Sequence, residues 1–159
     1  MSAIFANYSS LILFLHIIGA VIWIGGMIAI KMAVHPTLHK IEDEKVRLNA
    51  ILEVSKRLFA LVLPSILIII VTGLIMAIAL DGHHGSKKLL FIVKEAIWTI
   101  MAINYTFMVF KLFRAKRYFK EEKIEDLKAT MAPIPKIMLP INILLGMVAI
   151  FIGILIRGF

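Results

Sequence analysis

The sequence contains no cysteine, so disulfide bonds, iron–sulfur clusters and thiolate metal sites are excluded. It also lacks a phosphate-binding loop, a nucleophile elbow and a zinc-protease motif. Polar residues are scarce: 61% of the 159 residues are hydrophobic, and the mean hydropathy is +0.96. Average soluble domains are only about 45–50% apolar, so this chain requires lipid as its solvent.

Four apolar runs are each long enough to cross a bilayer, because a hydrocarbon core of about 30 Å needs roughly 20 helical residues. In lipid the backbone must satisfy its own hydrogen bonds, so each run should be helical. The sequence therefore predicts an all-α, integral membrane four-helix transmembrane bundle that forms one domain over residues 1–159. The predicted spans cover residues 11–30, 58–80, 89–110 and 137–156. The first run is too long for a signal peptide and lacks a basic leader, so we expect it to remain uncleaved.

Lysine and arginine are distributed unevenly between the two ends of these spans. Residues 31–57 hold six of them and residues 111–136 hold eight, whereas the loop at 81–88 holds two, the C-terminal end one and residues 1–30 none. Because basic loops stay cytoplasmic, we expect a multi-pass protein of the bacterial inner membrane with both termini outside. The bilayer is then the main partner, with anionic lipid as a secondary contact. No nucleic-acid partner is expected, and homo-oligomerisation is left open.

The two basic segments are predicted to be short and mostly solvated. We expect a turn at Pro36, followed by a cytoplasmic extension of the second span up to Arg57, and a loop with a helical start over residues 118–136. His35 and His39 are four residues apart, but the intervening Pro36 favours exposed loop histidines over a helical metal site.

His16 and Lys94 are the most informative ionisable residues. The first and third spans run in the same direction, and each of the two residues lies five positions after the start of its span. At about 1.5 Å per residue, both side chains lie roughly 7–8 Å below the outer boundary. Ionisable groups at such depth usually face a bundle interior or cavity, and burial favours their neutral, metal-binding forms.

The helix faces that carry these two residues suit either a ligand or close packing. The helix face that carries His16 has mostly small side chains and one tryptophan. The face that carries Lys94 is rich in aromatic and methionine side chains. The first face adds Gly19, Ala20, Trp23 and Gly26, and the second adds Trp98, Met101, Tyr105 and Met108. Small residues are also ordinary helix-packing positions in membranes, which is the simpler interpretation of Gly19 and Gly26. Lys94 could instead extend to the outer interface.

A b-type haem would suit this pair, since it needs an axial nitrogen and a dry slot between helices. No second histidine lies in another span, so the sixth ligand would be Lys94 or a methionine such as Met76 or Met147. Haem propionates could reach the outer cations Lys87, Lys88 and Arg157.

Two further polar groups have more modest interpretations. The run Asp81-Gly82-His83-His84 could bind copper or zinc from outside, but a simple turn is the preferred interpretation, because the ligand count is incomplete. Asn104 and Asn142 lie at similar depths in the inner half, which predicts an interhelical hydrogen bond.

The segment LHIIGAVIWIGG at residues 15–26 resembles the first span of CopD-like and HemJ-like membrane proteins. Thr72-Gly73 in the second span, and Lys94 and Asn104 in the third, are similar to the CopD-like pattern. The HemJ-like Tyr-Leu-Pro-Arg stretch is replaced here by residues 29–32, and Glu95 stands where that family usually has an apolar residue.

The HemJ resemblance implies haem b held by His16 and Lys94, and oxidation of protoporphyrinogen IX in porphyrin biosynthesis. We accordingly expect a haem-b-binding oxidoreductase acting on a tetrapyrrole or quinone-like molecule, with Gly19, Trp23 and Trp98 lining the cofactor and Lys94 or Tyr105 assisting proton removal. One alternative is a CopD-like copper transport or tolerance protein using His16 and methionines, with His83 and His84 as further ligands. The others are a non-catalytic cytochrome b and a cofactor-free structural subunit.

Overall fold

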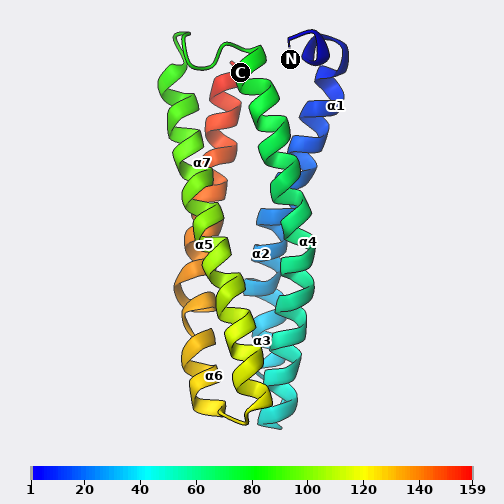
Figure 1. Ribbon diagram of the computed structural model, residues 1–159, viewed down its shortest axis with the longest axis vertical. Helices are drawn as coiled ribbons and strands as arrows, with labels where there is room; N and C mark the ends of the chain where they lie inside the picture. Colours follow the sequence, from blue (N-terminus) through cyan, green and yellow to red (C-terminus); the bar gives the residue numbers. More distant parts are fainter. Residues whose placement is uncertain (1, 159) are drawn as a thin grey trace.

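The computed structural model describes the backbone of residues 2–158 and the side chains of residues 5–158. Every regular element in this part is helical, and the helices form four long rods that lie side by side (Figure 1). All four rods are long and apolar enough to cross a membrane: Phe5–Leu38, Glu44–Ala79, Lys88–Lys120 and Ile124–Arg157. The predicted all-α four-helix bundle is therefore confirmed, and the chain is a multi-pass membrane protein.

Two of the rods are interrupted by π-helical turns. The first rod comprises α1 (Ser2–Ala20), η1 (Val21–Gly25), α2 (Gly26–Ala29), η2 (Ile30–Val34) and α3 (His35–Leu38). The second and third rods are the single helices α4 (Glu44–Ala79) and α5 (Lys88–Lys120). The fourth rod comprises α6 (Ile124–Met131), η3 (Ile134–Met138) and α7 (Leu139–Arg157).

The predicted turn at Pro36 is wrong, because the first rod continues through this proline to Leu38. Pro36 occupies the first turn of α3, where a missing N–H has little consequence, and the π-turn η2 precedes it. The chain reverses after this helix, and Asp43 caps α4 by accepting a hydrogen bond from the Val46 N–H at 2.9 Å. The extension of the second span before residue 58 is present as the first part of α4.

The predicted solvated loop at 118–136 is also wrong. The helix α5 continues to Lys120, and the chain turns over residues 121–123, where Glu122 adopts a left-handed φ of 56°. The chain then forms α6 and η3, and Pro135 lies in the first turn of η3. Charge marks where a segment leaves the hydrocarbon, but it does not end a helix that still has a packing partner.

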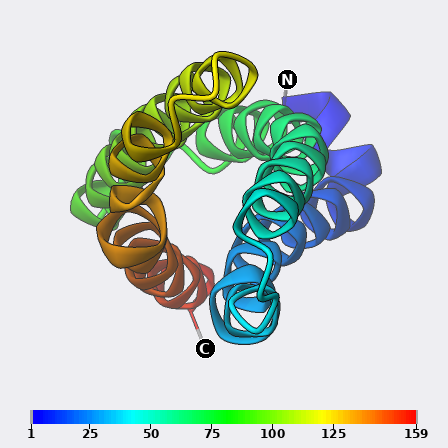
Figure 2. The same cartoon turned by 90° about the horizontal axis from the view of Figure 1, so that it is seen from below.

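The rods pack as two hairpins. The first hairpin pairs α1 with α4, and the second pairs α5 with α7 and α6; seen end on, the rods form a ring (Figure 2). Close approach between the hairpins occurs where η1 meets α7, because a Cβ added at Gly146 would lie 2.6 Å from the Ile24 side chain. At the end of the bundle opposite the α4–α5 loop, the Lys31 ammonium joins the hairpins by donating to the Pro135 carbonyl at 2.6 Å.

The predicted contact between Asn104 and Asn142 is confirmed. The Asn104 Nδ2 donates to Asn142 Oδ1 at 2.7 Å and to the Met138 carbonyl at 2.9 Å. Asn142, which is fully buried, donates in turn to the Met101 carbonyl at 3.2 Å. These bonds fix α5 against α7 in a medium that offers the two amides no water.

The outer surface of the rods is apolar, as a lipid-facing surface should be. Large side chains point outward from all four rods, for example Phe14, Leu67, Phe107 and Phe151, each more than half exposed. Such a continuous exposed apolar surface is compatible with a bilayer and not with water.

Replacing Asn142 with leucine should destabilise the protein by about 1 kcal/mol, because two interhelical hydrogen bonds are lost at about 0.6 kcal/mol each. The measurement is unfolding of the detergent-solubilised protein by SDS. Asn49→Leu is the matched control, since Asn49 is exposed on α4. Equal stability of the two variants would contradict a stabilising role for the asparagine pair.

The charge asymmetry predicts that a reporter fused after Gly158 lies outside and that one inserted in the turn at 121–123 lies in the cytoplasm. The terminal residue Phe159 lies outside the described residues, but α7 ends at the same end of the bundle as the turn between α4 and α5 (Figure 1). Paired phosphatase and fluorescent fusions measure this arrangement. Cytoplasmic fluorescence from the C-terminal fusion would show that the protein has the opposite orientation.

Candidate functional site

His16 is held by α4 in a defined orientation. Its Nδ1 lies 2.9 Å from the hydroxyl oxygen of Thr72, which is buried. The Thr72 hydroxyl has only one proton, and that proton is directed at the Ile68 carbonyl, 2.6 Å away on the same helix. The Thr72 oxygen must therefore accept, so the Nδ1–H of His16 donates and the neutral ring keeps its lone pair on Nε2.

A glycine lets the imidazole lie close to α4. A Cβ built at Gly73 would be 3.4 Å from His16 Cε1, so a larger residue there would press on the ring. The sequence pointed to Thr72-Gly73 only through the family pattern. The hydroxyl and the glycine act on a residue 56 positions away, and spacing along one chain gives no signal for such a contact.

Lys94 lies on α5 against α7, and its Nζ is 3.0 Å from the position that a Cβ on Gly153 would occupy. It is close enough to His16 to interact with it electrostatically, although the two residues belong to different hairpins. The neighbouring Glu95 turns to the loop between α4 and α5 instead, where His83 Nε2 lies 3.1 Å from its carboxylate. Among the described residues, no carboxylate pairs with Lys94.

His16 and Lys94 differ in their hydrogen-bond partners. Besides Thr72, the His16 ring has a hydrogen-bond partner in the Ile69 backbone of α4, Lys94 has no hydrogen-bond partner within the described part of the chain, and both side chains are half-buried. Lys94 Nζ is not sealed from its surroundings, because Trp23 Nε1 is the one fully buried side-chain nitrogen or oxygen there that lacks a partner. The site thus offers an imidazole lone pair and a primary amine at the meeting of two hairpins.

The predicted aromatic and glycine neighbours differ in their roles. Trp98 is half-buried on the Lys94 face of α5. Trp23 is 3% exposed within the π-turn η1, and its unpaired N–H costs about 1–3 kcal/mol unless a bound group accepts it. Gly19 faces α4, where an added Cβ would lie 3.1 Å from the Ser65 carbonyl oxygen. Gly19 therefore serves helix packing, as the simpler interpretation held.

Tyr105 has a structural partner. Its hydroxyl donates to the Phe59 carbonyl at 2.6 Å, and its ring, 5% exposed, packs edge-on against Phe59 and Trp23. The phenol proton is thus already hydrogen-bonded to α4. A role for Tyr105 in proton removal would require this buried contact to break first.

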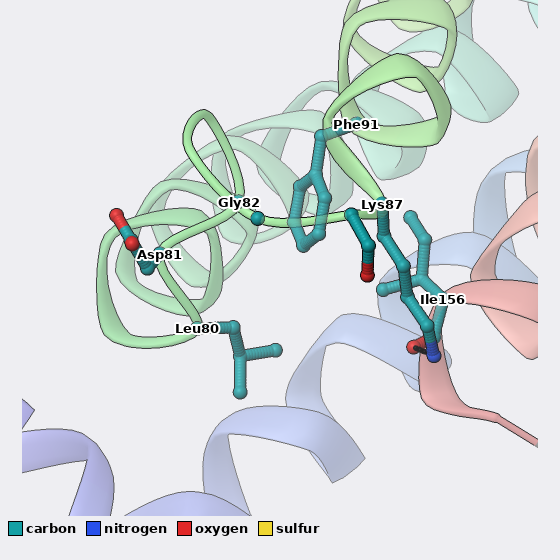
Figure 3. A pocket seen from close by; sticks show the side chains of 8 residues that line it. Leu80, Asp81, Gly82, Lys87, Phe91 and Ile156 are labelled. Carbon is teal, nitrogen blue, oxygen red and sulfur yellow. Dashed lines mark hydrogen bonds between the residues drawn. The ribbon is translucent and has the colours of Figure 1, made fainter.

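At the end of the bundle where α4 is joined to α5, a cavity of about 220 Å³ lies beneath the connecting loop (Figure 3). Lys87, a predicted partner for propionates, borders this cavity and donates to the Ile156 carbonyl at 2.6 Å, where it caps the end of α7. Asp81 lies on the far side of the loop and pairs with His84 at 2.9 Å. Lys88 is exposed and is free to meet an anion.

The structure gives little support to the methionine and loop-histidine residues as metal ligands. Met147, a candidate sixth ligand, is 48% exposed on the lipid-facing side of α7, while Met76 is half-buried. His83 and His84 each pair with a different carboxylate. Within residues 5–158, no group of three or more histidine, aspartate or glutamate side chains could hold a metal ion.

The donor set nevertheless fits a b-type haem. An axial histidine normally donates its second nitrogen to a neighbouring acceptor, and Thr72 is that acceptor here. Gly73 and Gly153 let His16 and Lys94 lie close to the opposite helices. Comparisons of the chain with protein-family models, with curated proteins and with solved structures found no match.

Proposed function

We propose that this chain is a haem-b-binding membrane oxidoreductase of HemJ-like type, with His16 as the axial ligand. The observation that carries the proposal is the hydrogen bond from His16 Nδ1 to Thr72, because it directs the free lone pair of the ring to Nε2. Lys94 would serve as the opposite ligand, or would bind a carboxylate of the cofactor or substrate. Bound haem would supply one-electron redox chemistry, which none of the amino-acid side chains here provides.

The proposed substrate is an amphipathic reductant of the tetrapyrrole class. Protoporphyrinogen IX loses six electrons and six protons on becoming protoporphyrin IX, and the electrons would pass towards the respiratory chain. The residues of this chain contribute an apolar wall at Trp98 and cations at Lys94 and Lys88, which suit a molecule with an apolar body and two carboxylates. A quinol has a similar amphipathic character and is the second candidate.

A non-catalytic cytochrome b is the alternative that one observation favours. The Tyr105 hydroxyl is buried and bonded to the Phe59 carbonyl, so one of the two candidates for proton removal already has a partner. If Lys94 is a haem ligand, it cannot also accept protons. The site would then transfer electrons without processing a substrate.

The visible spectrum of the purified protein separates haem binding from the other functions. We expect a Soret band with about one haem b per chain. A full-length, folded protein that contains copper and no haem would overturn the proposal in favour of copper handling.

Complementation tests the reaction. The protein should restore haem-dependent growth and lower porphyrinogen accumulation in a bacterium that lacks its own protoporphyrinogen oxidase. Rescue should disappear with His16→Ala and persist with Thr99→Val, a control whose hydroxyl bonds only to its own helix. A haem-loaded, membrane-inserted protein that gives no rescue would favour the cytochrome.

A further inference from the structure

A second cavity lies at the opposite, basic end of the bundle, far along the rods from His16. Its volume is about 300 Å³, and it is a half-open hollow lined by α3 and η2 of the first rod, the first half of α4, and α6 and η3 of the fourth rod. This end is the one seen in Figure 2. The cavity takes no part in the proposed redox site.

The floor of the cavity is apolar and well packed. Phe59, Leu127 and Ile134 line it, and each is at most 5% exposed. These side chains come from α4, α6 and η3, so the space lies between the two hairpins and not within one of them. An apolar space of this kind accommodates hydrocarbon.

The rim of the cavity is positively charged. Five side chains with basic nitrogens line it, and none of the described lining residues is acidic: Lys31, His35, His39, Lys128 and Lys136. Only Lys128 has carboxylates close by, at 2.6 Å from Glu44 and 2.9 Å from Glu125. The other four cationic or imidazole groups have no carboxylate partner in the part of the chain that the structure describes.

These groups are also held close to one another. His35 and His39 have their Nε2 atoms 3.2 Å apart, and His35 interacts electrostatically with Lys31. The Lys31 ammonium is fixed by its bond to the Pro135 carbonyl, which also lines the cavity. Lys31 and Lys136 carry positive charge without a carboxylate partner among the described residues, and the histidine pair adds N–H donors beside them, so an anion at this rim would find both charge and hydrogen bonds.

We propose that this cavity binds an anionic phospholipid of the surrounding membrane, with its phosphate at the Lys31–His35–Lys136 rim and part of an acyl chain on the apolar floor. Basic pockets between transmembrane helices at the cytoplasmic side favour such headgroups. Because the lipid would touch both hairpins, it would stabilise their association at this end of the bundle. This inference is independent of haem and of the proposed reaction.

The test compares the full-length protein in nanodiscs of phosphatidylcholine containing a titrated fraction of phosphatidylglycerol, with bound lipid counted by native mass spectrometry. Phosphatidylglycerol should bind in preference to phosphatidylcholine. The double variant Lys31→Gln/Lys136→Gln should weaken this binding about 25-fold, since each lysine near an anionic lipid contributes about fivefold. Lys40→Gln/Lys120→Gln is the matched control, because both lysines are exposed and lie outside the cavity.

A third variant tests the apolar half of the site without removing charge. Ala132→Phe would place a ring in the cavity that Ala132 lines, so it should reduce lipid binding as strongly as loss of the cations. Equal binding of the two lipids, or equal loss in the Lys40/Lys120 control, would overturn the proposal. Oleate that displaces phosphatidylglycerol at lower concentration than the phospholipid itself would also overturn it, in favour of a free fatty acid.

Discussion

His16→Ala should yield a folded protein without stoichiometric haem, the largest single effect that we expect. The substitution removes the proposed ligand, whose Nδ1 is held by the Thr72 hydroxyl of α4. Loss should be nearly complete by the pyridine haemochrome assay, because no other described side chain can take its place against α4. A normal Soret band and full occupancy in this variant would remove His16 as the ligand.

Variants of Thr72 distinguish an axial ligand from a histidine that merely fills space. Thr72→Val removes the acceptor for Nδ1–H and should weaken haem binding about 10–100-fold, the usual effect of losing such a partner. Thr72→Ser retains the hydroxyl and should remain within a few-fold of the parent protein. Thr99→Val is the control, since it removes a similar hydroxyl that contacts no histidine.

Lys94 should affect the spectrum more than the amount of haem. Lys94→Ala removes the candidate sixth ligand while leaving His16 and Thr72 in place, so a low-spin spectrum should become high-spin. An unchanged low-spin spectrum would assign Lys94 to carboxylate binding instead. In that case Lys94→Ala should still weaken substrate turnover.

Gly19→Ala should separate α1 from α4, the second large effect. The added Cβ would lie 2.8 Å from Ile69 Cγ1 and 3.1 Å from the Ser65 carbonyl, and a backbone atom cannot move aside as a flexible side chain can. Overpacking of this kind costs about 1–3 kcal/mol, which exceeds the gain of about 1 kcal/mol in helix propensity. Because His16 is one helical turn away, haem occupancy should fall as well.

Gly25→Ala is the matched control for this prediction. Gly25 also lies on the first rod, but a Cβ added there would meet nothing within 4 Å. This variant should be as stable as the parent protein or slightly more stable. The measurements are the stability to SDS and the haem occupancy of both variants. Equal stability and equal occupancy in the two variants would show that close packing at Gly19 is unimportant.

The sequence determined the membrane fold. Apolar length is a local property of the chain, so the four runs could be recognised without knowledge of their partners, and an all-α bundle followed from the needs of the backbone in lipid. The depth of a residue within its span is also a local property, because it is set by the number of residues from the start of the span. For that reason the contact between Asn104 and Asn142 could be predicted from counting residues.

Only the tertiary structure decided which groups meet around each helix and where each helix ends. Spacing along one helix does not say which neighbouring helix a side chain will face. For that reason neither the Thr72 acceptor of His16 nor the Phe59 acceptor of Tyr105 could be predicted from spacing. The continuation through Pro36 depended on a π-turn and on packing against α4, which outweigh the local preference of proline to end a helix. The basic cavity arose in the same way, because its walls come from segments about 100 residues apart that only folding brings together.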